Sequence, residues 1–254
     1  MDIYLIVGIF LGLFSVIVGM IVKGANVAVL INPAAIIIIF VGMVAALINS
    51  YPQKDIKRLP KIFGIIFQNK TYDAPKTIKT IVELSNLARR DGLLALESSV
   101  QSLEDPYLKM GLEMVVDGVD PEQIKETLEN EIAGMEDRHH VGASMLQTAG
   151  TTSPTLGVLG AVIGLIGALG NLNDVDALGH MISAAFVATL YGIFFGYVLF
   201  LPFSNRLKIK SQSEVLIMMI TIEGVMAIQA GQSPKTIEQK LYSLIEPDQR
   251  MQSS

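Results

Sequence analysis

The sequence predicts an all-α integral membrane protein with four transmembrane helices and a helical cytoplasmic domain between helices two and three. Hydrophobic residues make up 51% of the 254 residues and charged residues only 17%, against about 25% charged in a typical soluble domain. The missing charges leave four long apolar runs. No segment of useful length alternates polar and apolar residues, as an amphipathic strand would. These three observations favour helices that cross a bilayer.

The four apolar runs are each near the length of about 20 residues that a helix needs to cross the hydrocarbon core. The first run lacks the basic segment that precedes a cleaved signal peptide, so we expect it to be retained as a helix. The predicted spans are residues 3–22, 31–49, 155–172 and 181–203. The expected organisation is therefore a span pair in 1–49, a cytoplasmic helical domain in 50–154, a second span pair in 155–203, and C-terminal cytoplasmic helices and tail in 204–254.

The distribution of Lys and Arg predicts the orientation. One of these residues, Lys23, lies between spans one and two, and none lies in 173–180. Twelve lie in 50–154 and six follow residue 203. Because positive charge stays on the cytoplasmic side, both termini and the central domain are expected in the cytoplasm. The two short loops then face outward.

Helix signals divide the cytoplasmic domain. Asp73-Ala74-Pro75 starts one helix, which Gly92 ends, and a second helix is expected before Asp105-Pro106. Asp120-Pro121-Glu122-Gln123 has the form of a capping box, and the helix that it starts is expected to continue towards span three. Pro154 is placed at the start of span three, where proline is sterically easy. Ser233-Pro234 starts a short helix in the tail.

Overall composition excludes several functional classes. The net charge is −5 and there is no Cys, so a basic nucleic-acid binder, a disulfide framework and a Cys-based zinc site are excluded. We find no catalytic triad, no phosphate loop and no dinucleotide-binding glycine motif. We therefore expect no enzyme, no cofactor and no metal site.

Small residues recur along spans three and four at helical spacing. Such residues let helix backbones approach closely inside lipid. The stripes favour tight helix packing, within one chain or between copies, and the number of such faces favours an oligomer. The residues singled out for packing are Gly157, Gly160, Gly164, Ala188, Gly192 and Gly196.

No Asp, Glu, Lys, Arg or His lies inside any predicted span. A chain that moves ions across lipid by itself would normally need such a group. Either the protein does not conduct ions, or a second subunit supplies the carboxylate. Hydroxyl residues such as Thr155 and Thr189 could line a hydrated path or bond to their own helix carbonyls.

Three motifs, together with the layout, resemble the MotA/PomA family of flagellar motor stator subunits. They are "LARRDGLLALE" at 87–97, "SPTLGVLGAVIGLI" at 153–166 and "AFVATLYGIFFGYVLFLP" at 185–202. The resemblance covers nearly the whole chain. It implies a bacterial inner-membrane protein that forms a pentamer around a dimer of MotB, whose single membrane helix carries an essential Asp. Ion flow past that Asp would turn the ring, and the cytoplasmic heads would push the rotor protein FliG.

The resemblance also implies roles for individual residues. Arg89, Arg90 and Glu97 match the family's torque charges, which engage opposite charges on FliG. Pro154 and Pro202 match its two membrane-boundary prolines, which couple ion flow to head movement. Thr189 matches a hydroxyl residue that faces the MotB Asp, and Thr155 is grouped with this ion pathway.

One residue departs from the sodium-driven relatives, which carry a second Thr in span three. This chain has Ala161 at that position. A sodium ion that loses water needs several oxygen ligands, and a methyl group provides none, so protons are predicted as the coupling ion in preference to sodium. The alternatives are a sodium-driven stator, an energy-transducing subunit of the ExbB/TolQ type, and a membrane scaffold without ion flow. The four-span layout and the 87–97 motif argue against the ExbB/TolQ type.

Overall fold

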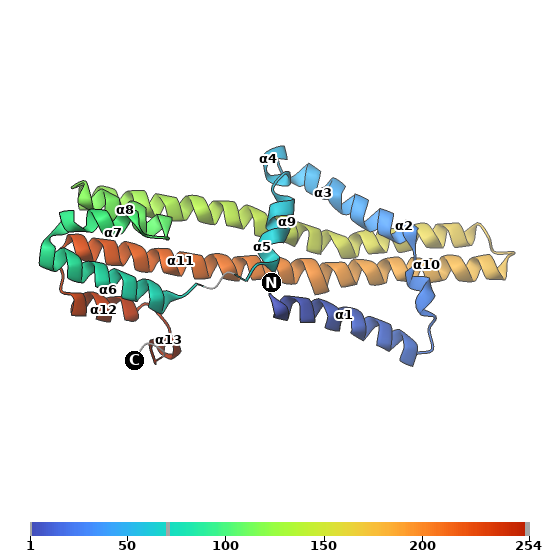
Figure 1. Ribbon diagram of the computed structural model, residues 1–254. Helices are drawn as coiled ribbons and strands as arrows, with labels where there is room; N and C mark the ends of the chain where they lie inside the picture. The colour runs from blue at the N-terminus through green and yellow to red at the C-terminus, as the bar shows by residue number, and fades with distance from the viewer. Residues whose placement is uncertain (1, 70–71, 252–254) are drawn as a thin grey trace. The chain divides into compact units, whose positions relative to one another are not determined.

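The computed structural model describes residues 2–69 and 72–251, and this part of the chain is helical and contains no strand (Figure 1). Four helical segments, at Ile3–Val22, Val27–Ser50, Pro121–Leu169 and Val175–Gln229, are long and apolar enough to cross a membrane. The all-α membrane fold class is therefore confirmed. The chain forms two compact units. We call residues 1–69 and 139–208 the membrane unit, and residues 70–138 and 209–254 the head unit.

The first half of the membrane unit consists of the 20-residue helix α1 and six shorter helical segments, and side chains cap the starts of some of them. Asp2 accepts a hydrogen bond from the Leu5 N–H, and Asn32 accepts one from the Ala35 N–H. The segments are α1 (Ile3–Val22), the 3₁₀ helix η1 (Val27–Leu30), α2 (Pro33–Ile36), the π-helical stretch η2 (Ile37–Val41), α3 (Gly42–Ser50), α4 (Gln53–Ile56) and α5 (Leu59–Phe67).

Two long helical segments supply the second half of the membrane unit. Asp174 caps the second of them by accepting from the Ala177 N–H. The elements are α9 (Pro121–Leu169), α10 (Val175–Ile193), the π-helical stretch η4 (Phe194–Phe200) and α11 (Leu201–Gln229). In Figure 1, α3 and α1 flank the pair formed by α9 and α10.

The helix bounds differ from the sequence expectation at one proline. Pro154 does not start a helix, because it lies inside the 49-residue helix α9. The expectation is wrong because the residues before Pro154 keep a helical pattern that carries the helix through it. The compact units also divide at residues other than 50 and 154, since α9 and α11 each contribute residues to both units.

The head unit contains six further helical elements. Asp73, Asp105 and Ser233 cap three of them by accepting backbone N–H bonds, and Gly92 ends the first with a backbone φ of +87°. The elements are α6 (Ala74–Asp91), the 3₁₀ helix η3 (Leu93–Ala95), α7 (Leu96–Gln101), α8 (Pro106–Val116), α12 (Pro234–Tyr242) and α13 (Pro247–Met251).

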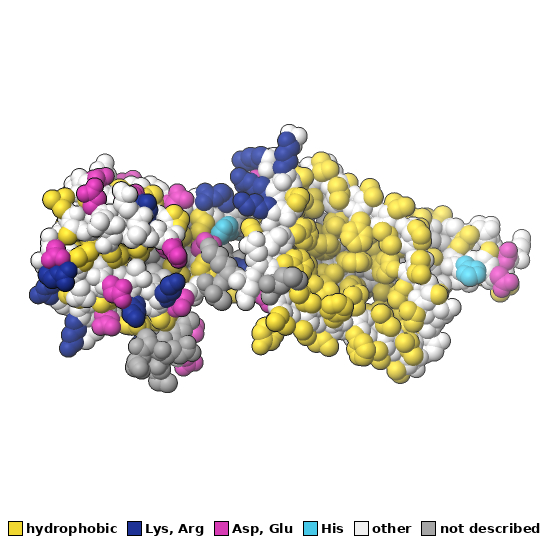
Figure 2. Space-filling view, viewed as in Figure 1, with side chains coloured by type: hydrophobic (Ala, Val, Ile, Leu, Met, Phe, Trp, Pro, Cys, Tyr) yellow, Lys and Arg dark blue, Asp and Glu magenta, His cyan; other side chains and the backbone are white. Residues whose placement is uncertain are grey.

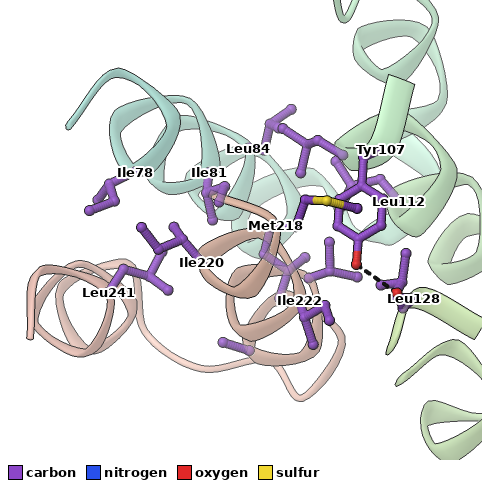
Figure 3. Packing of buried hydrophobic residues seen from close by; sticks show 14 of the residues in the cluster. Ile78, Ile81, Leu84, Tyr107, Leu112, Leu128, Met218, Ile220, Ile222 and Leu241 are labelled. Atoms are coloured by element: carbon purple, nitrogen blue, oxygen red, sulfur yellow. Dashed lines mark hydrogen bonds between the residues drawn. The ribbon is translucent and has the colours of Figure 1, made fainter. Parts of the chain in front are cut away.

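Helices from both parts of the head sequence meet in one hydrophobic core (Figure 3). Its only labelled polar group is buried Tyr107, whose hydroxyl donates to the Leu128 carbonyl over 2.9 Å. That bond satisfies a hydroxyl that would otherwise be buried without a partner. The labelled core residues are Ile78, Ile81, Leu84, Tyr107, Leu112, Leu128, Met218, Ile220, Ile222 and Leu241.

The surface of the membrane unit is apolar, in contrast to that of the head unit. Figure 2 shows hydrophobic side chains over most of its visible face. On α1, Tyr4 is 87% exposed and Phe10 67%. Exposed apolar side chains of this density fit contact with lipid or with other membrane helices.

Candidate functional site

The membrane unit holds its closest helix contact between α9 and α10. A Cβ atom built on Gly157 would lie 2.8 Å from the Ala188 carbonyl oxygen, and one built on Gly192 would lie 2.5 Å from the Ser153 carbonyl oxygen. A Cβ on Gly160 would meet the Ala188 Cβ at 2.9 Å. Gly164 has the same relation to Ala185, again at 2.9 Å. The two backbones therefore pack at a distance that no larger side chain fits.

Pro154 lies next to this contact, where its Cα would be 3.1 Å from a Cβ built on Gly192. It has no N–H to donate to the Gly150 carbonyl four residues earlier in the helix. A Cβ built on Gly196 would lie 2.6 Å from that carbonyl oxygen and 2.9 Å from Cδ of the Pro154 ring. Gly196 thus leaves room for both the freed carbonyl and the ring.

Pro202 occupies a different setting. It is exposed and is the second residue of α11, just after the π-helical stretch η4 ends at Phe200 and the hydrogen-bond register of the helix changes. The structure therefore brings Pro154 to the α9–α10 contact and leaves Pro202 outside it.

The hydroxyl residues near the contact bond to their own helices. Thr155 Oγ1 donates to the Thr152 carbonyl over 2.7 Å and is exposed. Half-buried Thr189 donates to the Ala185 carbonyl over 3.4 Å, which is a weak bond. A hydroxyl whose proton is used in this way still offers its oxygen lone pairs to an incoming donor. Ala161 is half-buried on α9 and offers no oxygen.

Polar bonds tie the segment between α1 and α2 to α10. The Asn32 side-chain amide donates to the Ala184 carbonyl over 3.2 Å, and the Tyr191 hydroxyl donates to the Leu30 carbonyl. Next to this bond, the rings of Phe40 in η2 and Phe195 in η4 pack edge-to-face, with centroids 4.8 Å apart. The two π-helical stretches therefore contact each other, and no periodicity in the sequence indicated them.

Much of the outward surface of α9 and α10 has no partner within the chain. Ile166 is 64% exposed, Leu169 is 69% exposed and Phe186 is 71% exposed. No described residue from His140 to Asn173 carries an ionisable side chain apart from His140 itself. The apolar parts of α9 and α10, residues 141–169 and 181–193, are thus close-packed, contain no Asp, Glu, Lys, Arg or His, and have open apolar faces.

A second candidate site is the tip of the head unit, where α6 ends and α7 begins. Arg89, Arg90 and Glu97 are all exposed there. Arg90 pairs with Asp91 at 2.8 Å. The hydrogen bond from Arg90 holds the pKa of the Asp91 carboxyl below its usual range, and the same bond raises the pKa of Arg90. The carboxylate therefore stays ionised at neutral pH.

One residue at this tip was not singled out from the sequence. Leu94 lies in η3 between the charged residues and is 75% exposed, whereas Leu96 two positions later is fully buried. Both leucines belong to the same apolar run, so only the backbone turn after Gly92 separates their environments. Leu94 therefore offers an apolar side chain at this charged surface.

Comparison with known proteins shows which families this chain is similar to. Residues 99–220 match the family described as "MotA/TolQ/ExbB proton channel family" and residues 6–92 match the one described as "Motility protein A N-terminal". Motility protein A of Bacillus subtilis is 48% identical over 252 residues, which cover 99% of this chain and 93% of that protein.

Two solved structures have the same fold. The flagellar MotAB stator complex from Bacillus subtilis contains a chain with a TM-score of 0.91 and 48% identity, covering 97% of each chain. Campylobacter (C. jejuni) MotAB contains one with a TM-score of 0.93 and 34% identity, covering 98% of this chain and 97% of that chain.

Proposed function

This chain belongs to the MotA/TolQ/ExbB proton channel family and is a flagellar stator subunit, and from that premise we propose how it works. It assembles with MotB, and ion flow between the two proteins drives a ring of these chains around the MotB dimer. The heads transmit the movement to the rotor protein FliG. The observation that carries this proposal is the α9–α10 pair, which is open to partners and contains no Asp, Glu, Lys, Arg or His in its apolar part.

In this proposal a partner protein supplies the carboxyl group that carries the proton. Proton transfer through lipid needs an ionisable group at membrane depth, and α9 and α10 offer only hydroxyls there. An Asp on a MotB helix, lying against the exposed apolar face of α9 and α10, fills that role. The solved MotAB complexes of two relatives support the choice of partner.

Thr189 is the residue that we assign to face the MotB acid. Its hydroxyl proton is directed at the Ala185 carbonyl, so its lone pairs can accept a hydrogen bond from a protonated carboxyl group. A charged carboxylate is costly in this apolar setting and a neutral one much less so. Each protonation change thus alters which neighbouring copy the acid prefers, and Thr155 continues the path at the cytoplasmic side.

The tip of the head unit serves as the rotor contact. Arg89, Arg90 and Glu97 engage opposite charges on FliG, and Leu94 adds an apolar contact at the centre of the patch. Exposed ion pairs are individually weak, at about 0–1 kcal/mol. Weak contacts suit a surface that must bind and release at every step.

The exposed apolar faces and the glycine stripes favour a homo-oligomer, and the family resemblance sets it at a pentamer. The positive-inside pattern supports an inner-membrane location with both termini in the cytoplasm. Protons are the coupling ion, since Ala161 replaces the hydroxyl that sodium-driven relatives carry. The ExbB/TolQ role is disfavoured because residues 6–92 match the motility protein A N-terminal family.

Reconstitution into vesicles tests the proposal that MotB supplies the acidic group. We expect vesicles that contain this chain alone to hold a proton gradient, and vesicles that contain the complex with MotB, opened for ion flow, to lose it. Replacing the MotB Asp with Asn should abolish the flux while the complex still assembles. Rapid proton leakage through this chain alone would contradict the proposal.

A further inference from the structure

A dense group of basic side chains lies beside the membrane spans. We call Lys54, Lys57, Arg58 and Lys61 the basic collar. All four are exposed, with Lys54 on α4, Lys61 on α5, and Lys57 and Arg58 between the two helices. Figure 2 shows Lys and Arg side chains gathered over this segment. The chain as a whole is acidic, with a net charge of −5, so the collar is a positively charged patch on an acidic protein.

The backbone fixes the collar at the ends of two spans. The α3 helix, which ends the second span, stops at Ser50, four residues before Lys54. At the other end of the collar segment, the Asp2 N–H donates to the Phe67 carbonyl over 3.1 Å, directly before α1 begins at Ile3. The segment therefore runs between the ends of spans one and two, at the level where a bilayer places its headgroups.

The apolar side of α5 holds the collar in this place. Ile62 and Ile66 are buried in the hydrophobic core of the membrane unit, together with Met145 and Phe203. The Tyr51 hydroxyl, at the start of the segment, bonds to Thr148 Oγ1 over 2.9 Å. The helix thus has one packed apolar side, and the collar residues remain exposed.

The collar charges are available for an outside anion. Asp55 is the only acidic residue in the segment, and it is 6% exposed and paired with Arg58 at 3.3 Å. Among the described residues, no carboxylate forms an ion pair with Lys54, Lys57 or Lys61. Clusters of basic residues directly next to a membrane helix attract anionic lipids.

We infer that the basic collar binds the phosphate headgroups of anionic phospholipids in the leaflet that it faces. The occupant is a lipid because the collar adjoins the ends of two spans. This inference concerns neither ion flow nor the rotor, so it stands or falls separately from the proposed function.

Lipid selectivity tests the inference. The full-length chain, co-purified with MotB, is reconstituted into phosphatidylcholine vesicles, and the relative association of spin-labelled phosphatidylglycerol and phosphatidylcholine is measured by electron spin resonance. The test variant is Lys54→Gln/Lys57→Gln/Lys61→Gln. The matched control is Lys76→Gln/Lys79→Gln/Lys235→Gln, which removes three exposed charges from the head unit.

We expect the wild-type chain to prefer phosphatidylglycerol. The collar variant should lose at least about fivefold of that preference, because one basic residue near an anionic surface strengthens binding about fivefold and the variant lacks three. The control and a Lys→Arg collar variant should keep the preference. No preference in the wild-type chain, a collar variant that keeps it, or an equal loss in the control would overturn the inference. Displacement of the lipid by inorganic phosphate at the same concentration would show that the collar binds free phosphate instead.

Discussion

Gly192 and Ser153 approach so closely that a methyl group on Gly192 would lie 2.5 Å from the Ser153 carbonyl oxygen. The atom in the way is backbone, which cannot rotate aside. The contact of α10 with α9 therefore depends on a missing side chain, and its sensitivity to a single carbon atom can be measured.

Gly192→Ala should destabilise the purified complex by about 1–3 kcal/mol, because overpacking forces the two helices apart, and should stop swimming. Thermal unfolding in detergent and motility in soft agar measure the two effects. Gly8→Ala is the matched control, since a Cβ on Gly8 meets nothing within 4 Å. Normal swimming by the Gly192 variant would mean that the contact is looser than described.

Pro154→Ala should separate stability from function. The new N–H can donate to the Gly150 carbonyl, so the melting temperature should hold or rise, given that a proline inside a helix costs about 3 kcal/mol. Swimming should fail, because the ring that packs on Gly196 is gone. Pro60→Ala, at an exposed helix start, should leave both unchanged. If the chain were a scaffold without ion flow, cells with either Pro154→Ala or Pro60→Ala would swim normally.

Arg89→Glu should reduce torque sharply, and a compensating charge reversal on FliG should restore part of it. Arg89 is exposed at the tip of the head unit, so folding should not suffer. Lys79→Glu makes the same change of charge at another exposed position of α6 and should swim as the wild type does. Torque is read from tethered cells. Equal effects of both substitutions would indicate a general effect of charge.

Replacing sodium with potassium in the medium should leave swimming speed unchanged. Half-buried Ala161 gives a sodium ion no oxygen ligand, and a partly dehydrated cation needs several. A protonophore should stop the motor at constant sodium. Motors that stop when sodium is removed would refute proton coupling.

Asp2→Asn should destabilise the membrane unit by about 2–4 kcal/mol. Asp2 forms an ion pair with Arg206, and the Arg206 Nε is buried without a hydrogen-bond partner. Removing one member of a buried pair leaves the other charge uncompensated. The estimate is below that for full burial because the Arg206 side chain is 29% exposed.

Glu129→Gln is the control for this change. It breaks the exposed Lys125–Glu129 pair and should cost only about 0.3–0.5 kcal/mol. Similar melting shifts in the two variants would mean that the Asp2 pair is not protected from solvent.

The sequence predicted what local patterns determine. The first span is α1, Ile3–Val22, to the residue, because its ends are marked by Asp2 and Lys23. The stop at Gly92 is likewise local, since its φ of +87° suits glycine. The small residues Gly157 and Gly192 were picked from spacing, and the structure places them against each other.

Other features depend on tertiary packing, which a local pattern does not contain. The head unit combines residues from two distant stretches of the chain. Pro154 lies within a helix because the surrounding turns and the Gly196 backbone accommodate it. Leu94 and Leu96 differ in exposure although their sequence context is nearly the same. A charge-free run indicates a membrane-spanning helix, but it does not indicate which face of that helix packs against other helices.

The bonds from Asn32 and Tyr191 have a practical consequence for labelling experiments. The connection between the first two spans is anchored to span four at the Ala184 carbonyl and through Leu30. An epitope or fluorophore inserted after Ile31 would therefore disturb the part of α10 that carries Thr189. The described hydrogen bonds of the turn at residues 170–174 run only within the turn and to its own flanking helices α9 and α10. A reporter attached at this turn should therefore leave the motor running.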